Sequence, residues 1–430
     1  MYLGNGEGEV TLMRDESNLY WVWLAGRVGI GSKEFAKLVS VMPDPYDVYR
    51  LSEEEIEQLK IGARLKQRLC DKSLTDAYDI IKYCKSEKVD IIGYSDKRYP
   101  ARLRNIEDPP VLLYCKGKLP DMNSGLCFGM VGTRKMSEYG KRTSYKISYE
   151  LSAAGVCIVS GMASGIDGVC ACGAMEAGGN TVAVLGNGIS ITYPKEHGAL
   201  SKAIRSHGAV ITEFPPYERP LRGNFPKRNR IISGLCQGVL VVEGVKGSGA
   251  LITAKSTVQQ GRELFALPGQ VSAPTSEGPN ELIREGANVA RSAQDIIDHN
   301  DFLYHDTFDY RSYNKAKGNS ELKEKVLKKY GVSPICEGEQ TDTAPKTQEK
   351  KETPAAPVKK EQTASVADLS ALDALDEETR KIYGLLPDGV FTADALTAKG
   401  VAIYHAMTAL TMLEISGLVK SMPGGAYKKL

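Results

Sequence analysis

The 430-residue sequence lacks the motifs that mark the common nucleotide-binding and metal-dependent proteins. It has no Gly-Lys-Ser or Gly-Lys-Thr tripeptide, so it has no Walker A phosphate loop. No glycine-rich segment carries the full Gly-x-Gly-x-x-Gly fingerprint with an acidic residue about twenty positions later. Only five histidines occur, and no two have a familiar metal-ligand spacing. These absences disfavour ordinary NAD or ATP binding, and we expect no cofactor and no metal ion.

The sequence also has little net charge and no long apolar run. Its formal charge is +2, so any attraction for nucleic acid must come from a local patch of charge. The apolar run from Leu19 to Ile30 is too short to span a bilayer and contains Arg27. Residues 1–10 lack the basic segment and apolar core of a secretion signal. We therefore expect a cytoplasmic protein with no membrane partner.

The chain has nine cysteines, an odd number, and they are spread along its length. This usage indicates reduced thiols in a cytosol. Cys170 and Cys172 could be a fragment of a metal site, but no second cysteine pair lies near them. Buried, inert thiols are the favoured interpretation.

Catalytic groups are equally hard to find. Ser160, Ser164 and Ser248 have no evident partner base, and the histidines at 197 and 207 are isolated positions that suit a helix surface. We expect no catalytic residues.

Residues 126–299 alternate between short, dense apolar runs and helical patterns. The expected strands are 126–131, 156–160, 181–185, 209–212, 239–243 and 263–267, and the helices between them are 139–154, 167–177, 196–206, 229–236 and 250–260. Such strands are typical of a sheet that helices cover on both faces. The alternation predicts an α/β fold with a Rossmann-like, doubly wound, mostly parallel sheet.

Composition and pattern divide the chain into four expected parts. They are a helical N-terminal domain (1–85), an extended Rossmann-like core (86–310), a disordered linker (311–367) and a winged-helix domain (368–430). The linker prediction depends on a proline- and lysine-rich stretch, 341–367, that has no aromatic residue.

Two functional alternatives stay open for the outer domains. A turn with glycines at 29 and 31 is similar to that of helix-hairpin-helix (SAM-like) modules, although a plain helical packing domain also fits. The winged helix could bind DNA, contact a protein or act as a spacer.

Glycine loops follow four of the predicted core strands, at 129–132, 160–165, 186–188 and 244–249. In a doubly wound sheet these loops meet at the carboxyl edge of the strands, where ligands bind. Glycine lets backbone N–H groups approach phosphate oxygens, and each following helix start adds a favourable dipole. Four such loops at one edge favour an anionic ligand.

A cationic segment accompanies these loops. Residues 219–230 hold five cationic side chains and no carboxylate, and Phe225 lies among them. Arg134 directly follows the first core strand, which places its guanidinium beside the glycine loops. Charges for phosphates and a flat ring for bases suit single-stranded nucleic acid.

Part of this segment could instead be structural. Arg228 or Arg230 could pair with Glu213 or Glu243 and hold the loops in shape.

The chain resembles the DprA/Smf family of DNA-processing proteins. The resemblance covers about residues 90–290 and is carried, in the family's order, by Gly132-Thr133-Arg134, Ser160-Gly161-x-Ala163-x-Gly165-Ile166-Asp167, Tyr193-Pro194, Phe225-Pro226-x-Arg228-Asn229-Arg230-Ile231-Ile232-Ser233-Gly234 and Leu251-Ile252-Thr253-Ala254.

The resemblance implies a protein, not an enzyme, that binds single-stranded DNA on its Rossmann-like domain. It also implies a homodimer that helps load the RecA recombinase during natural transformation and recombination. The implied DNA-binding residues are Gly132, Thr133, Arg134, Ser160, Gly161, Gly165, Phe225, Lys227, Arg228, Asn229, Arg230 and Gly249. Two positions depart from the family: Ala171 stands where histidine is frequent, and Ala250 where a small polar residue is frequent. Neither change removes a cation, so phosphate binding should survive.

The alternative is an enzyme that acts on a nucleotide. Rossmann-like phosphoribohydrolases, which release cytokinin bases, are similar in fold and carry a Pro-Gly-Gly-x-Gly-Thr loop followed by a glutamate. Here Gly247-Ser248-Gly249-Ala250 is followed by Thr253 and Lys255, with no carboxylate at that place.

Overall fold

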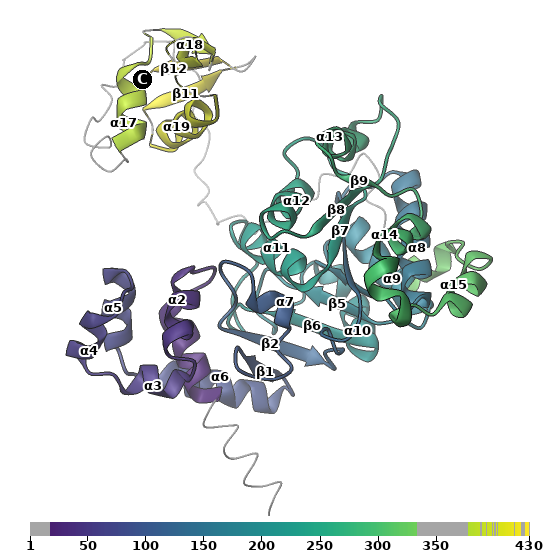
Figure 1. Ribbon diagram of the computed structural model, residues 1–430, viewed down its shortest axis with the longest axis horizontal. Coiled ribbons are helices and arrows are strands. Elements are labelled where there is room, and N and C mark those ends of the chain that lie inside the picture. The colour runs from purple at the N-terminus through teal and green to yellow at the C-terminus, as the bar shows by residue number, and fades with distance from the viewer. Residues whose placement is uncertain are drawn as a thin grey trace, which may run out of the picture. The chain divides into compact units, whose positions relative to one another are not determined.

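The computed structural model describes residues 18–332 and 377–429, apart from positions 388, 393, 398, 400, 402, 417 and 423–425. The chain divides into two compact units, at residues 1–341 and 342–430 (Figure 1).

A nine-stranded sheet forms the centre of the first unit, in the order β1-β2-β6-β5-β4-β3-β7-β8-β9 (Figure 1). Its strands are β1 (Asp90–Gly93), β2 (Leu112–Gly117), β3 (Cys127–Val131), β4 (Cys157–Ser160), β5 (Thr181–Val184), β6 (Gly208–Thr212), β7 (Gly238–Val241), β8 (Glu263–Ala266) and β9 (Asn288–Val289). All neighbours from β6 to β9 are parallel, whereas β2 is antiparallel to both β1 and β6. The prediction of a mostly parallel, Rossmann-like sheet is confirmed.

Helices cover both faces of this sheet, because alternate residues of each strand enter different cores. On β3, Phe128 and Met130 pack with α8, α9 and α14, whereas Cys127 and Val131 pack with α7, α11 and α12. The helices are α7 (Ala101–Arg104), α8 (Glu138–Ala153), α9 (Ile166–Glu176), α10 (Gly198–His207), α11 (Asn224–Leu235), α12 (Gly249–Gln259), α13 (Glu277–Arg284) and α14 (Ala293–Tyr304).

The strand order reverses at β3, and this reversal creates the place for a site. The chain passes from β3 through β4 and β5 to β6 in one direction, then returns to β7 on the other side of β3. Connections leave the carboxyl ends of β3 and β7 in opposite directions, so a crevice opens between them.

The N-terminal part is helical, as expected. A helix at residues 18–28 is followed by α2 (Glu34–Val41), α3 (Pro45–Arg50), α4 (Glu53–Gln58), α5 (Ala63–Cys70) and α6 (Thr75–Ser86). Trp21, Trp23 and Phe35 are buried among them. Ser52 caps α4 in the capping box that its spacing from Glu55 predicts.

The second unit contains three helices and a small antiparallel sheet with the order β10-β12-β11. Its elements are α17 (Glu377–Gly384), β10 (Val390–Thr392), α18 (Asp394–Thr397), α19 (Ile403–Ile415), β11 (Val419–Met422) and β12 (Ala426–Lys429). The sequence pattern predicts helices at 376–386, 392–399 and 404–416, and a hairpin of strands at 418–422 and 426–429. The structure has helices and strands close to these ranges, and β10 is an addition. The expected turn glycines, 424 and 425, lie outside the described residues.

The linker prediction is wrong for its first part. Residues 311–332 contain most of α15 (Tyr310–Lys317) and all of α16 (Glu324–Tyr330). Tyr313 and Leu327 are each only 1% exposed, and Lys141 of α8 donates to Glu324 at 2.8 Å. These short helices offer few apolar residues each, so their order depends on packing against the core, which the sequence pattern does not display. The rest of the predicted linker, 333–367, lies outside the described residues.

Two further expectations can be compared with the structure. Cys170 and Cys172 are fully buried in α9, as expected, and burial raises the pKa of each thiol, which disfavours the reactive thiolate form. In the part of the chain that the structure describes, none of the helices has both the length and the apolar character needed to cross a bilayer.

Truncation of Leu327 should destabilise the first unit, because α16 belongs to the packed structure. We expect Leu327→Ala to lower the free energy of unfolding by about 2–5 kcal/mol, as buried leucines do. Leu303→Ala is the matched control, since Leu303 is 76% exposed and such substitutions change stability by less than about 0.5 kcal/mol. Urea unfolding of both variants measures the difference, and equal midpoints would show that α16 does not contribute to the core.

Candidate nucleic-acid interface

A groove of about 1090 Å³ opens at the carboxyl ends of β3 and β7. Its walls come from the loop after β3, the start of α8, the first half of α11 and the segments around 245–253 and 273–275. Seven of the predicted contact residues line it: Gly132, Thr133, Arg134, Phe225, Arg228, Asn229 and Gly249. The tertiary fold therefore gathers into one groove residues that lie more than a hundred positions apart in the sequence.

Phe225 lies close to two guanidinium groups. The Cζ atoms of Arg134 and Arg228 lie 5.4 and 5.9 Å from the centre of its ring, and the ring of Tyr193 lies 5.7 Å away. A Cβ atom on Gly186 would come within 2.8 Å of the Phe225 Cδ1 atom, so glycine is needed there. Because cation–π contacts and ring packing fix its orientation, the half-buried ring is a rigid part of the groove wall.

Arg228 is a structural anchor as well as a groove residue. Its Nη1 atom donates to the carbonyl oxygens of Gly161, at 2.8 Å, and Val184, and its Nε atom donates to Asn229 Oδ1 at 3.1 Å. The side chain therefore ties α11 to the ends of β4 and β5. Burial lowers the pKa of Arg228 to about 10, which leaves the guanidinium protonated at neutral pH.

Backbone N–H groups of the loop after β4 have hydrogen-bond acceptors inside the protein. Asp167 Oδ2 accepts from the backbone N–H groups of Gly161 and Ala163, at 3.2 and 3.4 Å. Burial raises the pKa of this carboxyl group, and the neighbouring Arg228 opposes that rise. The amides that glycine exposes in this loop are therefore used by an internal carboxylate.

A second carboxylate serves the loop after β3 in the same way. Glu243 is 1% exposed and accepts from the backbone N–H and the hydroxyl of Ser137, at 2.9 and 2.5 Å, and from Thr275 Oγ1 at 3.0 Å. In the glycine loop 160–165, the amides of Gly161 and Ala163 are therefore already paired, and in the loop after β3 the amide of Ser137 is paired, which leaves fewer amides for an external anion than expected. Buried amides need partners, and the fold supplies them internally.

The start of α12 is different, because it remains open to the groove. Its N-cap residue, Ser248, makes no side-chain cap, and within the described part of the chain its buried Oγ atom has no hydrogen-bond partner. Gly249, the first residue of the helix, is exposed. A helix N-terminus that lacks a side-chain cap favours an anion, so the start of α12 has the electrostatic character that suits one.

Three predicted contact residues, Ser160, Gly161 and Gly165, lie beneath the groove and do not line it. The Ser160 hydroxyl donates to the Met130 carbonyl at 2.7 Å. Gly165 has a φ of +81°, and a Cβ atom there would lie 2.4 Å from the Thr133 carbonyl oxygen. These residues shape the loops from below, because their backbones pack closely against β3 and its loop.

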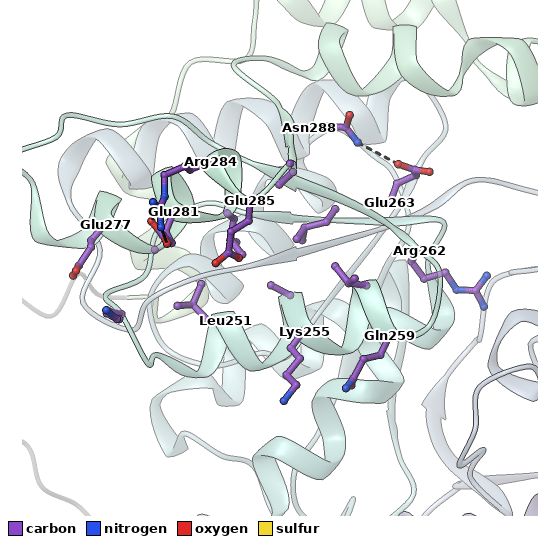
Figure 2. Close-up of a pocket in the computed structure, with 18 residues that line it drawn as sticks. Leu251, Lys255, Gln259, Arg262, Glu263, Glu277, Glu281, Arg284, Glu285 and Asn288 are labelled. Carbon is purple, nitrogen blue, oxygen red and sulfur yellow. Dashed lines mark hydrogen bonds and ion pairs between the residues drawn. The ribbon is translucent and has the colours of Figure 1, made fainter. Parts of the chain in front are cut away.

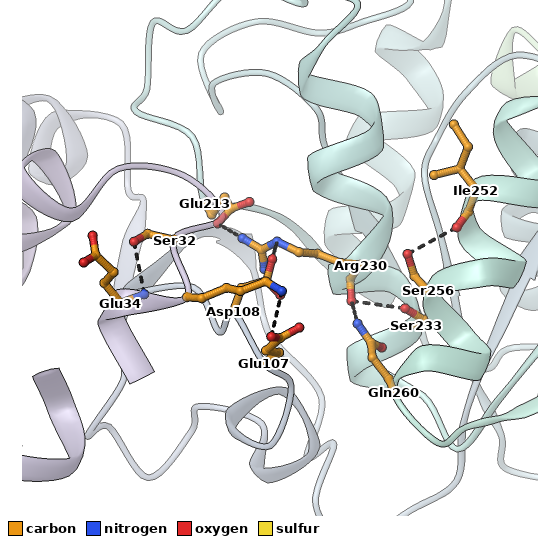
Figure 3. A network of polar contacts seen from close by, with 11 residues as sticks. Ser32, Glu34, Glu107, Asp108, Glu213, Arg230, Ser233, Ile252, Ser256 and Gln260 are labelled. Atoms are coloured by element: carbon orange, nitrogen blue, oxygen red, sulfur yellow. Dashed lines mark hydrogen bonds and ion pairs between the residues drawn. The ribbon is translucent and has the colours of Figure 1, made fainter. Parts of the chain in front are cut away.

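Arg230 is also placed away from the groove (Figure 3). Its guanidinium pairs with Glu213 at 2.5 Å and with Asp108 at 3.2 Å, and its side chain is 8% exposed. The pairing with Glu213 is one of the structural pairings that the sequence left open, and it engages the guanidinium that was predicted to contact DNA. A methyl group on Gly31 would lie 3.7 Å from Arg230 Nε, so the network also supports the turn of the N-terminal helices.

Lys227 also lies outside the groove lining, but it is exposed, whereas Arg230 is buried. It is exposed on the outer surface of α11, within three residues of Phe225 and Arg230. Its charge contributes to the forces that lower the pKa of Glu213, although burial raises that pKa more strongly. Lys227 therefore extends the positive charge from the groove towards the loop after β6.

A second groove, of about 940 Å³, lies where α12, β8, α13 and β9 meet (Figure 2). Its polar side chains have mixed charge and include Lys255, Glu281 and Arg284, and Asn288 donates to Glu263 across it at 3.1 Å. It contains none of the predicted contact residues and no excess of cations.

Comparison with known proteins connects this geometry to a family. The family model for DNA recombination-mediator protein A matches residues 90–301. DNA processing protein DprA of Bacillus subtilis (strain 168) is 41% identical over 214 residues, which are 50% of this chain and 72% of that protein. The chain belongs to the DNA recombination-mediator protein A family.

Other members of the family agree in sequence and fold. Protein Smf of Escherichia coli (strain K12) is 43% identical over 216 residues, which cover 50% of this chain and 58% of that protein. The X-ray structure of DprA from Streptococcus pneumoniae superposes with a TM-score of 0.56 at 31% identity, and the match covers 65% of this chain and 97% of that one. The resemblance stated from the sequence is therefore confirmed.

Several residues of the groove at the ends of β3 and β7 were not predicted from the sequence. Lys135, Ser248 and Thr253 line it, and Tyr193 supports the Phe225 ring from a separate loop. Lys135 could have been found from its place beside Arg134. The pairing of Glu243 with Ser137 had no local signal, since the two residues are 106 positions apart.

Within the described residues, no three histidine, cysteine, aspartate or glutamate side chains come together in a way that could hold a metal ion. His197 differs from the surface histidine expected there. It is 2% exposed, with Nδ1 3.1 Å from the Met162 carbonyl oxygen, and burial lowers its pKa.

Removal of Arg230 should leave Glu213 as an unpaired buried charge. We expect Arg230→Met to cost about 3–5 kcal/mol, and Arg230→Met/Glu213→Leu to recover much of that loss. Because burial without the arginine raises the folded-state pKa of Glu213, protonation relieves the strain. The deficit should therefore be smaller at about pH 5 than at about pH 8.

Chemical denaturation at both pH values measures these effects. Arg142→Met is the matched control, because Arg142 is an exposed arginine that pairs with Glu138 at the surface and should matter by less than about 1 kcal/mol. An Arg230→Met variant as stable as this control would contradict a structural role for the network.

Proposed function

We propose that this protein binds single-stranded DNA without sequence specificity in the groove at the ends of β3 and β7. The observation that carries the proposal is the Phe225 ring, which lies against Arg134 and Arg228 in the groove that also contains the open start of α12. An unpaired strand exposes both its bases and its phosphates. In this groove the rigid ring can stack on a base, and the cations and the helix N-terminus can bind phosphates. The ring offers no hydrogen-bond pattern that would select one base.

Each part of the groove has a distinct role in the proposal. Arg134 and Lys227 are exposed and neutralise phosphates, and Gly249 offers a backbone N–H at the start of α12. Thr133 and Asn229 orient the neighbouring backbone. Arg228 contributes charge from beneath the surface, whereas Ser160, Gly161, Gly165 and Arg230 act only by holding the loops.

We further propose that the protein is a homodimer that helps load the RecA recombinase onto single-stranded DNA in recombination and natural transformation. Its membership of a family described as recombination mediators supports this role. Light scattering would measure the oligomeric state. The rate of RecA filament assembly on DNA coated with a single-strand-binding protein would measure loading, and an unchanged rate would exclude it.

The domain organisation and location complete the proposal. The helices and the three-stranded sheet of residues 377–429 are consistent with a winged helix, and the N-terminal helices with a separate module beside the core. We place the protein in the cytoplasm, where single-stranded DNA intermediates and RecA are found.

Enzymatic hydrolysis of a nucleotide is the weaker candidate, and we propose that the protein is not an enzyme. The segment after Gly249 carries Thr253 and Lys255 where a phosphoribohydrolase would carry its glutamate. Glu243, the nearest buried carboxylate after β7, is fully engaged by Ser137 and Thr275. Incubation with nucleoside monophosphates and a measurement of free base tests this, and sustained turnover would favour the enzyme.

Loss of one exposed cation in the groove (Arg134) or beside it (Lys227) should weaken DNA binding for every sequence alike. We expect Arg134→Ala and Lys227→Ala each to lower affinity for oligothymidine and mixed-sequence oligonucleotides, and to reduce the slope of log K against log salt by about 0.7. Fluorescence anisotropy over a salt series measures both quantities. Arg291→Ala is the control, because that exposed arginine precedes α14 and lies outside the groove. Unchanged binding in both groove variants would remove the groove from the proposal.

A further inference from the structure

The strand order extends the carboxyl edge of the sheet from the groove towards the N-terminal helices. From β3 the order continues through β4 and β5 to β6, and all four strands are parallel. Phe225 rests on Gly186, directly after β5, and the loop of residues 213–223 follows β6. Adjacent strands lie about 4.8 Å apart, so the ends of β3 and β6 are separated by roughly 14 Å.

The loop after β6 has a fixed backbone. The N–H of Gly188 donates to the Glu218 carbonyl at 2.8 Å, and the N–H of Ser190 donates to the Pro216 carbonyl at 3.0 Å. Asn224 Nδ2 donates to the Arg219 carbonyl at 3.3 Å and to the Glu218 carboxylate at 3.3 Å. The loop is therefore held against the β5 loop that also supports Phe225, and the acidic side chain in it is engaged by Asn224.

Its outward side chains are aromatic, apolar and cationic. Tyr217 is 63% exposed, Leu221 is 55% exposed, and Arg219 and Arg222 are exposed as well. No salt bridge links either arginine to a carboxylate among the described residues. An exposed ring and an exposed leucine beside two exposed arginines form a mixed apolar and cationic surface of the kind that marks an interaction site.

A second ring holds Tyr217 in place. Tyr83, on the last turns of α6, lies 4.9 Å from it with an angle of 60° between the ring planes. The Nζ atom of Lys116 lies 5.9 Å from the centre of the Tyr83 ring. Tyr217 is thus packed edge to face on a half-buried ring, which restrains it while most of its surface faces solvent.

We infer that Tyr217, Arg219 and Arg222, supported by Tyr83, bind the continuation of the single strand that occupies the groove. The inference rests on the proposed function and extends it to the N-terminal helices through α6. The tyrosine ring stacks on a base, and the two guanidinium groups bind the adjacent phosphates. The roughly 14 Å between the ends of β3 and β6 correspond to about four nucleotides at a stacked rise of about 3.4 Å.

Oligonucleotide length separates this surface from the groove. With the full chain, we expect Tyr217→Ala to weaken binding of an oligothymidine of about 20 nucleotides roughly tenfold. It should leave one of about 3 nucleotides unaffected, because a strand that short cannot reach from the groove to Tyr217. Tyr217→Phe keeps the ring and should bind both lengths as the wild type does. Arg219→Gln/Arg222→Gln should reduce the salt slope by about 1.4 for the longer strand alone.

The matched control is Tyr78→Ala. Tyr78 is 59% exposed and lies on the same helix as Tyr83, so it tests the loss of an exposed tyrosine away from the loop. Circular dichroism and thermal unfolding establish that all variants fold like the wild type. The control should bind both oligonucleotides normally.

The outcomes of these measurements distinguish a failure of this inference from a failure of the proposed function. If Tyr217→Ala binds the longer strand like the wild type, or loses both lengths equally, the extension is wrong. Arg134→Ala should weaken both lengths, because its contact lies in the groove itself. If the wild-type protein binds neither length at low salt, both proposals fall together.

Discussion

The buried guanidinium of Arg228 is the interaction on which the groove depends. It joins α11 to the ends of β4 and β5 through two carbonyl oxygens, stands near Asp167, and lies under the ring of Phe225. A buried charge is tolerated only when its hydrogen bonds are satisfied, so these partners must keep their positions. The same side chain therefore fixes the loops, orients the aromatic ring and provides positive potential below the groove.

The carboxylates around this guanidinium decide where an external anion can bind. Glu243 and Asp167 take up the amides of the loops after β3 and β4, whereas Glu213 neutralises Arg230. What remains for a ligand is the uncapped start of α12 and the exposed cations Arg134 and Lys227. A chain of low net charge can thus have a locally positive groove, because its buried acidic groups are paired internally.

Most of the core could be predicted from the sequence, because each parallel strand is an apolar run that helices cover on both sides. β3, β4 and β7 begin and end within two residues of expectation. The predicted start of α11, at residue 229, is five residues later than the observed start at Asn224, and the observed helix includes Pro226. This proline lies in the first turn, where a missing N–H costs nothing. α15 and α16 were missed because their order comes from contacts with the core.

The sequence by itself determined the family, the sheet, and the residue types of the groove: Arg134, Phe225 and the cations around it. Only the tertiary structure decided which cations are free, since Arg228 and Arg230 turn inward while Lys227 stays exposed. It also decided that the rings of Tyr217 and Tyr83 meet. The reason is physical: apolar periodicity is a local property of the chain, whereas the burial and pairing of a charge depend on residues far away in sequence.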